Sequence, residues 1–302
     1  MPLHSAVLKY FDAIVRFGSI RRAADRLNVA SSAINRQILK LEDEIEVQLF
    51  ERLPRGVRLT PAGELLYQHI RKVLRDFEVV QSDIEELKGL RKGNVIIAAV
   101  EGIADEFLPR VVSEFHKQYS GISFTVNVLD PNEIISVLKS NSADIGLMFN
   151  PPPHSGVQQA ASVALKMGAI MTPSHPLAKR KKLRLKECQS YPLILPDTVH
   201  PNRDWLDSIF ALSANQSQPI VISNSFQLMR ELAKRQLGIA FQTTVGIEEE
   251  LHKGQLVHVP LGDRGLAASV FVALVRAKEG LPIAASAFLQ EVQKTFAAMG
   301  SP

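Results

Sequence analysis

Hydrophobic residues recur at helical spacing in two short runs near the amino terminus, separated by a break at Asn28 and Val29. The two runs are Ile20, Ala23, Ala24 and Leu27, and then Ala33, Ile34, Ile38 and Leu41. Asparagine tolerates the left-handed backbone that ends a helix, and the valine supplies an apolar plug, so the pattern predicts two helices joined by a tight turn. Such a pair is either a DNA-reading helix-turn-helix or an ordinary helical hairpin.

The polar positions of the second run carry side chains suited to reading DNA. They are Ser31, Ser32, Asn35, Arg36 and Lys40, and either serine can act as the N-cap of the helix. Amide and guanidinium groups form paired hydrogen bonds with adenine and guanine edges, while hydroxyl groups at a helix start reach phosphates or bases. Taken alone, such a face is more typical of a solvated helix.

Arginines surround a Pro-Gly turn in the next segment, VQLFERLPRGVRLTPAGE at residues 47–64. Arg52, Arg55 and Arg58 would project from a short ribbon toward a phosphate backbone or minor groove. A loop of solvated arginines is the alternative. Beside the two helices, the arrangement favours a DNA-contacting wing.

Beyond Thr60 and Pro61, hydrophobic residues alternate at steps of four and three, the heptad spacing of a helix that packs along one narrow stripe. The stripe consists of Leu66, Ile70, Val73, Phe77, Val80, Ile84 and Leu87. Its flanks are strongly polar, which favours pairing with the same helix of a second chain. An amphipathic helix lying on its own domain is the alternative.

The pattern changes after a polar, glycine-containing hinge at residues 89–93 to short apolar runs that alternate with amphipathic helices. We expect strands at residues 94–100, 122–128, 144–149, 168–172, 192–196, 220–223, 238–242, 256–260 and 268–275. We expect helices to begin near residues 104 and 131 and to span residues 202–211, 225–235, 245–252 and 282–299. This alternation predicts an α/β domain.

The amino-terminal patterns together resemble the winged helix-turn-helix of the LysR-type transcriptional regulators. The residues that carry the resemblance are Ala23, Ala24, Leu27, Ile34, Arg36, Gln37, Ile38, Leu41 and Glu42, followed by Leu49, Phe50, Arg52, Arg55, Leu59, Thr60 and Gly63. The chain departs from the family where it has Ala30-Ser31-Ser32 at the start of the recognition helix, and Asn35 in place of a common serine. Base preference is expected to differ accordingly.

The resemblance extends over almost the whole chain and implies a two-lobed effector-binding domain, similar to periplasmic solute-binding proteins. It is carried there by residues 108–109, Phe115, Asp144, residues 175–177 and residues 237–239. The expected fold class is α/β, with an all-α winged helix-turn-helix and a long linker helix before the two-lobed domain. The expected boundaries are 1–60 for DNA binding, 61–92 for the linker and hinge, and 93–302 for effector binding, with lobe one at 93–162 and 269–302 and lobe two at 163–268.

The resemblance also implies how such a protein works. The linker helix pairs across a homodimer, and a homotetramer and contact with RNA polymerase are expected beyond it. Two recognition helices on one DNA duplex require half-sites about 10 base pairs apart, or a multiple of that spacing. Effector-driven closure of the lobes would alter DNA bend and polymerase access.

The position of the effector follows from a general rule, because ligands of open α/β sheets sit beyond the carboxyl ends of the strands, near helix amino termini. The rule selects Val100, Glu101, Gly102, Ile103, Asp130, Phe149, Asn150, Thr198, His200, Gln242 and Thr243. The family often places a serine or threonine after the first strand to hold a carboxylate. Glu101 near that position either repels a carboxylate and favours an amine or hydroxyl group, or points into water.

Composition narrows the classes of protein further. A net charge of +4 places any DNA-binding function in a local surface, and the single cysteine, Cys188, is expected to be a small buried side chain. The chain has no apolar run of membrane-spanning length and no secretory leader pattern, so a cytoplasmic location is expected. Catalytic and phosphate-binding motifs are absent and the histidines are scattered, so we expect no enzyme activity, cofactor or metal site.

Three functional hypotheses remain from the sequence. The first is a transcriptional regulator that responds to a small-molecule effector and binds double-stranded DNA. The second is an α/β solute-binding or enzymatic module with an amino-terminal oligomerisation domain, and the third is a structural DNA-binding protein without a ligand. The arginines at residues 52–58 argue against the second, because oligomerisation gains nothing from them.

Overall fold

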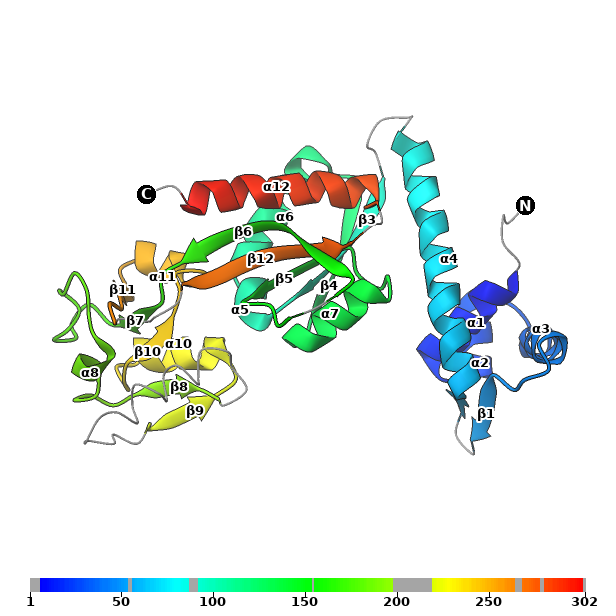
Figure 1. The fold of residues 1–302 in the computed structure, drawn as a ribbon, viewed down its shortest axis with the longest axis horizontal. Coiled ribbons are helices and arrows are strands. Elements are labelled where there is room, and N and C mark those ends of the chain that lie inside the picture. Colours follow the sequence, from blue (N-terminus) through cyan, green and yellow to red (C-terminus); the bar gives the residue numbers. More distant parts are fainter. Residues whose placement is uncertain are drawn as a thin grey trace. The chain divides into compact units, whose positions relative to one another are not determined.

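The computed structural model describes residues 6–53, 56–86, 92–153, 155–197, 219–263, 268–277 and 280–300. By its contacts the chain divides into two compact units, residues 1–88 and residues 89–302, leaving aside the three residues 140–142. The first unit, blue to cyan in Figure 1, is mainly helical, whereas the second combines sheets with helices.

Three helices open the first unit, namely α1 (Ala6–Phe17), α2 (Ile20–Leu27) and α3 (Ser31–Glu44). Helix α2 ends at Asn28 in the left-handed conformation, with φ 54° and ψ 47°, and Val29 packs partly buried against the core. The predicted turn is therefore confirmed. Residues that are buried in this core are Phe11, Ala13, Ile14, Ala23, Ala24, Ile34, Ile38, Leu49 and Ile70.

A two-stranded hairpin, β1 (Phe50–Leu53) and β2 (Gly56–Leu59), follows the helices. The carboxylate of Glu42 in α3 accepts hydrogen bonds from the backbone of Leu49 at 2.7 Å and of Phe50 at 3.1 Å. On the other side, Val57 N donates to the carbonyl of Gly18 at 3.1 Å. The hairpin is thus attached to the helices at both strands, and any side chain in place of Gly56, at φ +109°, would collide with that carbonyl.

Helix α4 (Pro61–Glu86) begins at Thr60, whose hydroxyl accepts a hydrogen bond from Gly63 N at 3.0 Å. Its first half packs on α1, where Tyr67 donates to Asp12 at 3.2 Å and stacks on Phe11. A threonine before proline is a typical helix start, because the proline needs no hydrogen-bond acceptor for an N–H group. The amino-terminal half of α4 therefore belongs to the helix-turn-helix core.

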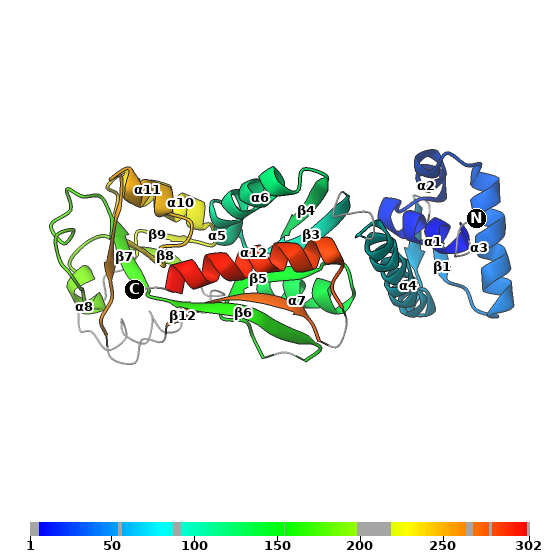
Figure 2. The same ribbon diagram turned by 90° about the horizontal axis from the view of Figure 1, so that it is seen from above.

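Lobe one of the second unit is a five-stranded sheet in the order β4-β3-β5-β12-β6. Strand β3 runs parallel to β4 and β5, and β12 runs antiparallel to β5 and β6. Helices α6 and α12 cover one face and α7 covers the other, as Figures 1 and 2 show. The elements are β3 (Gly93–Ala99), α5 (Glu101–Ala104), α6 (Phe107–Gln118), β4 (Ile122–Val128), α7 (Pro131–Lys139), β5 (Ile145–Phe149), β6 (Val157–Leu165), β12 (Ser269–Arg276) and α12 (Ile283–Gly300).

Lobe two contains a three-stranded sheet, β10-β7-β11, and a parallel pair, β8-β9. Its elements are β7 (Gly168–Met171), α8 (Leu185–Cys188), β8 (Ile194–Pro196), β9 (Val221–Ser223), α10 (Phe226–Lys234), β10 (Ala240–Gln242), α11 (Glu248–His252) and β11 (Val257–Pro260). The chain enters lobe two between β6 and β7 and returns between β11 and β12. The two lobes are therefore joined by two chain crossings.

Each expected strand overlaps an observed strand, although several observed strands are shorter. Strand β6 was not predicted, because its sequence VQQAASVAL interrupts the apolar alternation with glutamines and a serine at the edge of the sheet. Helices α1 and α8 were also missed. The helix expected at residues 202–211 lies outside the described residues.

Candidate nucleic-acid interface and effector cleft

The start of α3 differs from the sequence expectation. The N-cap is Ala30, with φ −70° and ψ 135°, and no side chain caps the helix. The N-cap role expected for Ser31 or Ser32 is therefore wrong, because both serines already lie in the first helical turn. Both are exposed, and neither hydroxyl forms a hydrogen bond with the part of the chain that is described.

Arg36 and Lys40 lie one turn apart on the exposed side of α3, opposite the buried Ile34 and Ile38. Lys40 approaches Glu44 at 3.8 Å, an exposed pair that exchanges readily with solvent. Arg36 has no ion-pair partner among the described residues. The outer face of α3 thus presents one unpaired guanidinium and one weakly paired ammonium group.

The hairpin and the recognition helix are connected through Asn35, whose Oδ1 accepts a hydrogen bond from Arg52 at 3.2 Å. On the same hairpin Arg58 forms an ion pair with Glu51, at 2.5 Å, and the hydrogen bond to this carboxylate, followed by its negative charge, raises the pKa of Arg58. These arginines remain exposed, so a phosphate can compete for them. Arg55 lies outside the described residues.

The heptad stripe on α4 divides into two parts. Ile70 is fully buried in the helix-turn-helix core and so cannot serve the predicted contact with a second chain, whereas Leu66 packs only partly buried against the same core. The helical repeat is the same for packing within and between chains, which is why the sequence did not separate them. Farther along, Val80 is 49% exposed and Ile84 51% exposed. Val73 and Phe77 are partly buried, and Leu87 lies outside the described residues.

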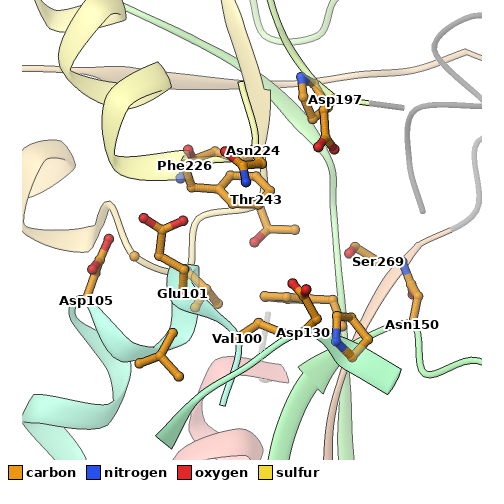
Figure 3. Close-up of a pocket in the computed structure, with 18 of the residues that line it drawn as sticks. Val100, Glu101, Asp105, Asp130, Asn150, Asp197, Asn224, Phe226, Thr243 and Ser269 are labelled. Atoms are coloured by element: carbon orange, nitrogen blue, oxygen red, sulfur yellow. The ribbon is translucent and has the colours of Figure 1, made fainter. Parts of the chain in front are cut away.

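A cavity of about 560 Å³ lies between the two lobes of the second unit (Figure 3). It is lined by Val100, Glu101, Gly102, Asp105, Val128, Leu129, Asp130, Pro131, Glu133, Phe149, Asn150, Met167, Pro196, Asp197, Asn224, Phe226, Arg230, Gln242, Thr243, Val245, Gly246 and Ser269. Its size falls within the range of small-molecule sites in proteins. The lining combines apolar walls with polar groups that come from both lobes.

The structure brings together eight of the eleven residues expected at the effector site. They are Val100, Glu101, Gly102, Asp130, Phe149, Asn150, Gln242 and Thr243. Ile103 is a correction, because its side chain is fully buried in the core of lobe one and does not line the cavity. Thr198 and His200 lie outside the described residues.

Glu101 points toward lobe two rather than into water. Its Oε1 accepts a hydrogen bond from the hydroxyl of Ser225 at 3.0 Å, and Ser225 is the N-cap of α10. The same hydroxyl accepts from Leu228 N at 3.3 Å. Figure 3 shows Glu101 extending from α5 toward Phe226. The open choice between a cleft-facing and a water-facing glutamate is thereby resolved in favour of the cleft.

Arg230 lines the cavity and was not predicted. It lies near Asp105 of lobe one at 3.7 Å and Glu250 of lobe two at 3.3 Å, and it donates to the carbonyl of Gly246. Its side chain is only 13% exposed, so these partners compensate the buried charge. Sequence rules based on strand ends missed it because the long side chain reaches the cleft from the middle of α10.

Some other lining residues of the cavity were missed because the strand-end rule was not applied to every predicted strand. Asn224 and Phe226 follow the carboxyl end of β9, which was predicted as a strand, so the strand-end rule would have selected them as well. Asp197 follows β8, and Ser269 begins β12. The strand-end rule thus also accounts for part of lobe two's contribution.

The lobes meet again beside the cavity at a group of acidic residues. Glu106 of lobe one accepts a hydrogen bond from Glu249 N at 2.8 Å, and Arg110 lies 3.8 Å from Glu248. Burial, followed by the negative charge of Glu248, raises the pKa of Glu106 to about 7. Nearby, Gly246 has φ +82°, and a Cβ there would press on the carbonyl of Gly102. The two backbones thus approach closely across the lobes.

Other candidate chemical groups are structural. Cys188 is fully buried, and burial raises the pKa of its thiol to about 12, as expected for a packed side chain. His258 lies 3.1 Å from the carbonyl of Gln242, and burial lowers its pKa.

Within the described ranges, no three His, Cys, Asp or Glu side chains are grouped closely enough to hold a metal ion. No helix in those ranges is both long and apolar enough to span a membrane.

Comparison with known proteins matches both units. Residues 6–64 match the family described as "Bacterial regulatory helix-turn-helix protein, lysR family", and residues 88–297 match "LysR substrate binding domain". The RuBisCO operon transcriptional regulator of Allochromatium vinosum is 30% identical over 255 residues, covering 83% of this chain and 82% of that protein. The transcriptional activator CmpR of Synechocystis is 26% identical, covering 92% and 91%.

Solved structures show the same fold. A full-length OxyR variant from Pseudomonas aeruginosa has a TM-score of 0.74 at 18% identity and covers 97% of this chain and 95% of its own. Full-length CbnR in complex with its target DNA has a TM-score of 0.64 at 18% identity and covers 96% and 98%. The family and these relatives are transcriptional regulators, not enzymes. With both family domains present in order, this chain belongs to the LysR family of DNA-binding transcriptional regulators.

Proposed function

We propose that this regulator binds double-stranded DNA as a homodimer or a pair of homodimers, and that a small-molecule effector in the cleft between its lobes controls it. The observation that carries the proposal is the 560 Å³ cavity, whose polar lining comes from both lobes. A ligand that contacts both walls changes the balance between open and closed lobes, because it binds the closed arrangement better. The expected domain boundaries at residues 60, 92 and 93 are part of this proposal.

DNA recognition is assigned to the exposed face of α3 and to the hairpin. Ser31, Ser32, Asn35, Arg36 and Lys40 would face the major groove, with base edges read by the amide and guanidinium groups. Arg52, Arg55 and Arg58 would contact the phosphate backbone or minor groove. Support comes from the exposure of the described members of this set other than the half-buried Asn35, and from the Asn35–Arg52 hydrogen bond, which connects helix and hairpin.

Dimerisation is assigned to the second half of α4. Val80 and Ile84 are half exposed at heptad spacing, and a second copy of the helix would cover them. Leu66, Val73, Phe77 and Leu87 complete the proposed contact, whereas the fully buried Ile70 is excluded from it. Two recognition helices would then bind half-sites about 10 base pairs apart or a multiple of that distance.

Effector binding would be transmitted through the contacts between the lobes. Glu101–Ser225 and Asp105–Arg230 connect α5 with α10, so a ligand between these groups acts directly on the relative position of the lobes. A coupling free energy of about 1–3 kcal/mol suffices to change the affinity for DNA by roughly 5- to 150-fold. In this scheme the protein works in the cytoplasm, affects RNA polymerase access, and carries no cofactor or catalytic site.

The test is selection of genomic fragments by the purified full-length protein, followed by footprinting at near-physiological salt. The expected result is protection of one or two discrete sites that contain inverted half-sites. Salt-sensitive binding without a preferred fragment would contradict sequence-specific regulation. The genes beside a protected site then supply candidate effectors for addition to the same assay.

A further inference from the structure

We infer that the effector of this cleft is an organic cation of metabolite size, with an amine or guanidine group on a hydrocarbon body. The inference rests on the proposed effector site and specifies what class of ligand that site accepts. It goes against the carboxylate effector that the family's usual serine or threonine would favour, and it is carried by four independent features of the lining.

The first feature is the imbalance of charge. Among the described residues, the cavity is lined by five acidic side chains and one basic side chain. The acidic ones are Glu101, Asp105, Asp130, Glu133 and Asp197. Within the described ranges, only Asp105 of these five has an ion-pair partner. In a partly enclosed site such charges favour a cationic ligand and oppose an anionic one.

The second feature is that Arg230, the one basic side chain in the described lining, already pairs with carboxylates of the protein. Arg230 is held between Asp105 and Glu250 and donates to the carbonyl of Gly246. A carboxylate or phosphate ligand would therefore meet a guanidinium whose charge two protein carboxylates already balance. Because the guanidinium is largely buried, a ligand anion that drew it away from those carboxylates would leave their charges uncompensated, which is unfavourable.

The third feature is that the helix amino termini around the cavity already carry protein carboxylates. The carboxylate of Glu101 lies at the N-cap of α10, bonded to Ser225. Helix α7 begins with Pro131, which has no N–H group, and Glu133 accepts from Asp130 N at 3.2 Å. Helix amino termini attract anions, but here the chain supplies the anions itself. An external anion therefore finds these positions filled.

The fourth feature is a pair of polar side chains at the cavity wall that can exchange hydrogen bonds with a ligand. Gln242 is 7% and Thr243 6% exposed, and both line the cavity. Neither side chain forms a hydrogen bond with any described residue. Their amide and hydroxyl groups can both donate and accept, so a ligand with N–H or O–H groups can form hydrogen bonds with them at the cavity wall. In Figure 3 Thr243 lies between the walls that carry Asp197 and Asp130.

The apolar part of the lining defines the rest of the ligand. Val128, Leu129 and Met167 offer surface to a hydrocarbon chain. Phe149 and Phe226 add aromatic rings, which attract cations at their faces. Because no three metal-binding side chains converge in the described residues, the positive charge is best supplied by an organic group rather than by a metal ion. A cavity of about 560 Å³ accommodates such a molecule.

Isothermal titration of the full-length protein with three four-carbon ligands tests the inference. Putrescine carries two ammonium groups, butanediol two hydroxyl groups and succinate two carboxylates on chains of equal length. A wider panel of amines, including agmatine and spermidine, is titrated beside a panel of carboxylates and sugar phosphates. We expect amines to bind and to raise the melting temperature of the protein. Butanediol should bind more weakly, and succinate should not bind.

Variants locate the binding. Asp197→Asn is expected to weaken amine binding by about tenfold, the effect of removing one partly desolvated charge, and Asp130→Asn, which removes an exposed carboxylate, is expected to weaken it less. Glu114→Gln, the loss of one exposed carboxylate on α6 outside the cleft, is the matched control and is expected to leave binding unchanged. Retained operator binding by each variant shows that it is folded.

The outcomes separate the two proposals. Binding of anions alone, strengthened by Asp197→Asn, overturns the cationic class but keeps the cleft as an effector site. Amine binding that is weakened equally by Glu114→Gln also overturns the inference, since general charge attraction then explains it. If neither panel binds while footprints remain normal, both the cationic class and the effector role of the cleft fail.

Discussion

Helices α3 and α10 both begin beside serines, but the two helix starts differ in what they leave open. At the start of α3, Ser31 and Ser32 are exposed, the N-cap is Ala30, and no acidic residue lies in the first turn. At the start of α10, Ser225 caps the helix and holds the carboxylate of Glu101. The partial positive charge of a helix start is thus available to an external anion in α3 and already satisfied internally in α10.

This difference gives the two ends of the protein opposite preferences. An open helix start beside Arg36 and Lys40 suits the phosphates and base edges of DNA. At α10 the helix start already holds the carboxylate of Glu101, and the acidic cavity beside it suits a cation. The same physical effect therefore supports both functions, and changing one side chain at either start is enough to test the comparison.

The largest expected effect follows from Arg36→Ala on the exposed face of α3. If the guanidinium makes a paired contact with a base, specific operator affinity falls by about 1–3 kcal/mol, roughly 5- to 150-fold. Titration of the operator at fixed salt measures the loss. Lys117→Ala, an exposed cation on α6, serves as the control, and equal affinities for all three proteins would remove Arg36 from the reading surface.

Ser32→Asp places a carboxylate at the start of α3, as Glu101 does at the start of α10. The new carboxylate stabilises the helix by about 0.3–1 kcal/mol but repels DNA phosphate, so we expect an unchanged or higher melting temperature together with about tenfold weaker operator binding. Ser32→Ala separates loss of the hydroxyl from gain of charge. Tighter DNA binding by the aspartate variant would contradict an open, anion-accepting helix start.

Glu101→Gln makes the reverse change at α10. The amide can still accept from Ser225, but the negative charge is lost, so we expect unfolding to become easier by about 0.5 kcal/mol. Amine binding should weaken in the same variant. Thermal melting and titration with putrescine check both effects, and a stabilised variant with unchanged amine affinity would refute the role given to this charge.

Glu106 predicts a smaller effect that depends on pH. Its pKa is raised from 4.5 to about 7, so the protonated form favours folding below pH 4.5 and this contribution is lost as pH rises through 7. Glu106→Gln stays neutral, and its melting temperature should exceed that of wild type by about 2 °C at pH 8 but not at pH 4.5. Glu248, Glu250 and Arg110 face the same group. Parallel melting curves across this range would contradict the assignment.

The helix-turn-helix could be predicted nearly residue by residue because local rules determine it. A left-handed Asn28, the small Ala23 and Ala24, and the plug at Val29 follow from backbone geometry and close helix packing. The cap at Ala30 was missed, because serine favours an N-cap but does not fix which residue occupies it. The assignment of Ile70 failed for a related reason, since periodicity indicates a buried stripe without identifying what covers it.

The cleft was predicted in outline because strand ends converge in this type of sheet. Asp130 and Thr243 follow from that rule, whereas Arg230 does not, since its guanidinium reaches the cavity from within a helix. Ile103 was selected by its position in sequence, yet its side chain turns into the core. Sequence neighbours share a location, but the direction of each side chain is set by packing.

The close approach of Gly246 to the carbonyl of Gly102 has an evolutionary consequence. A single base change in a glycine codon introduces alanine, and the added methyl group at residue 246 would act as a wedge between the lobes, in a backbone conformation that alanine rarely adopts. A wedge of this kind holds the lobes apart whether or not an effector is present. Selection for regulators that ignore their signal is therefore expected to recover substitutions at this glycine, in a different unit of the chain from the residues proposed to contact DNA.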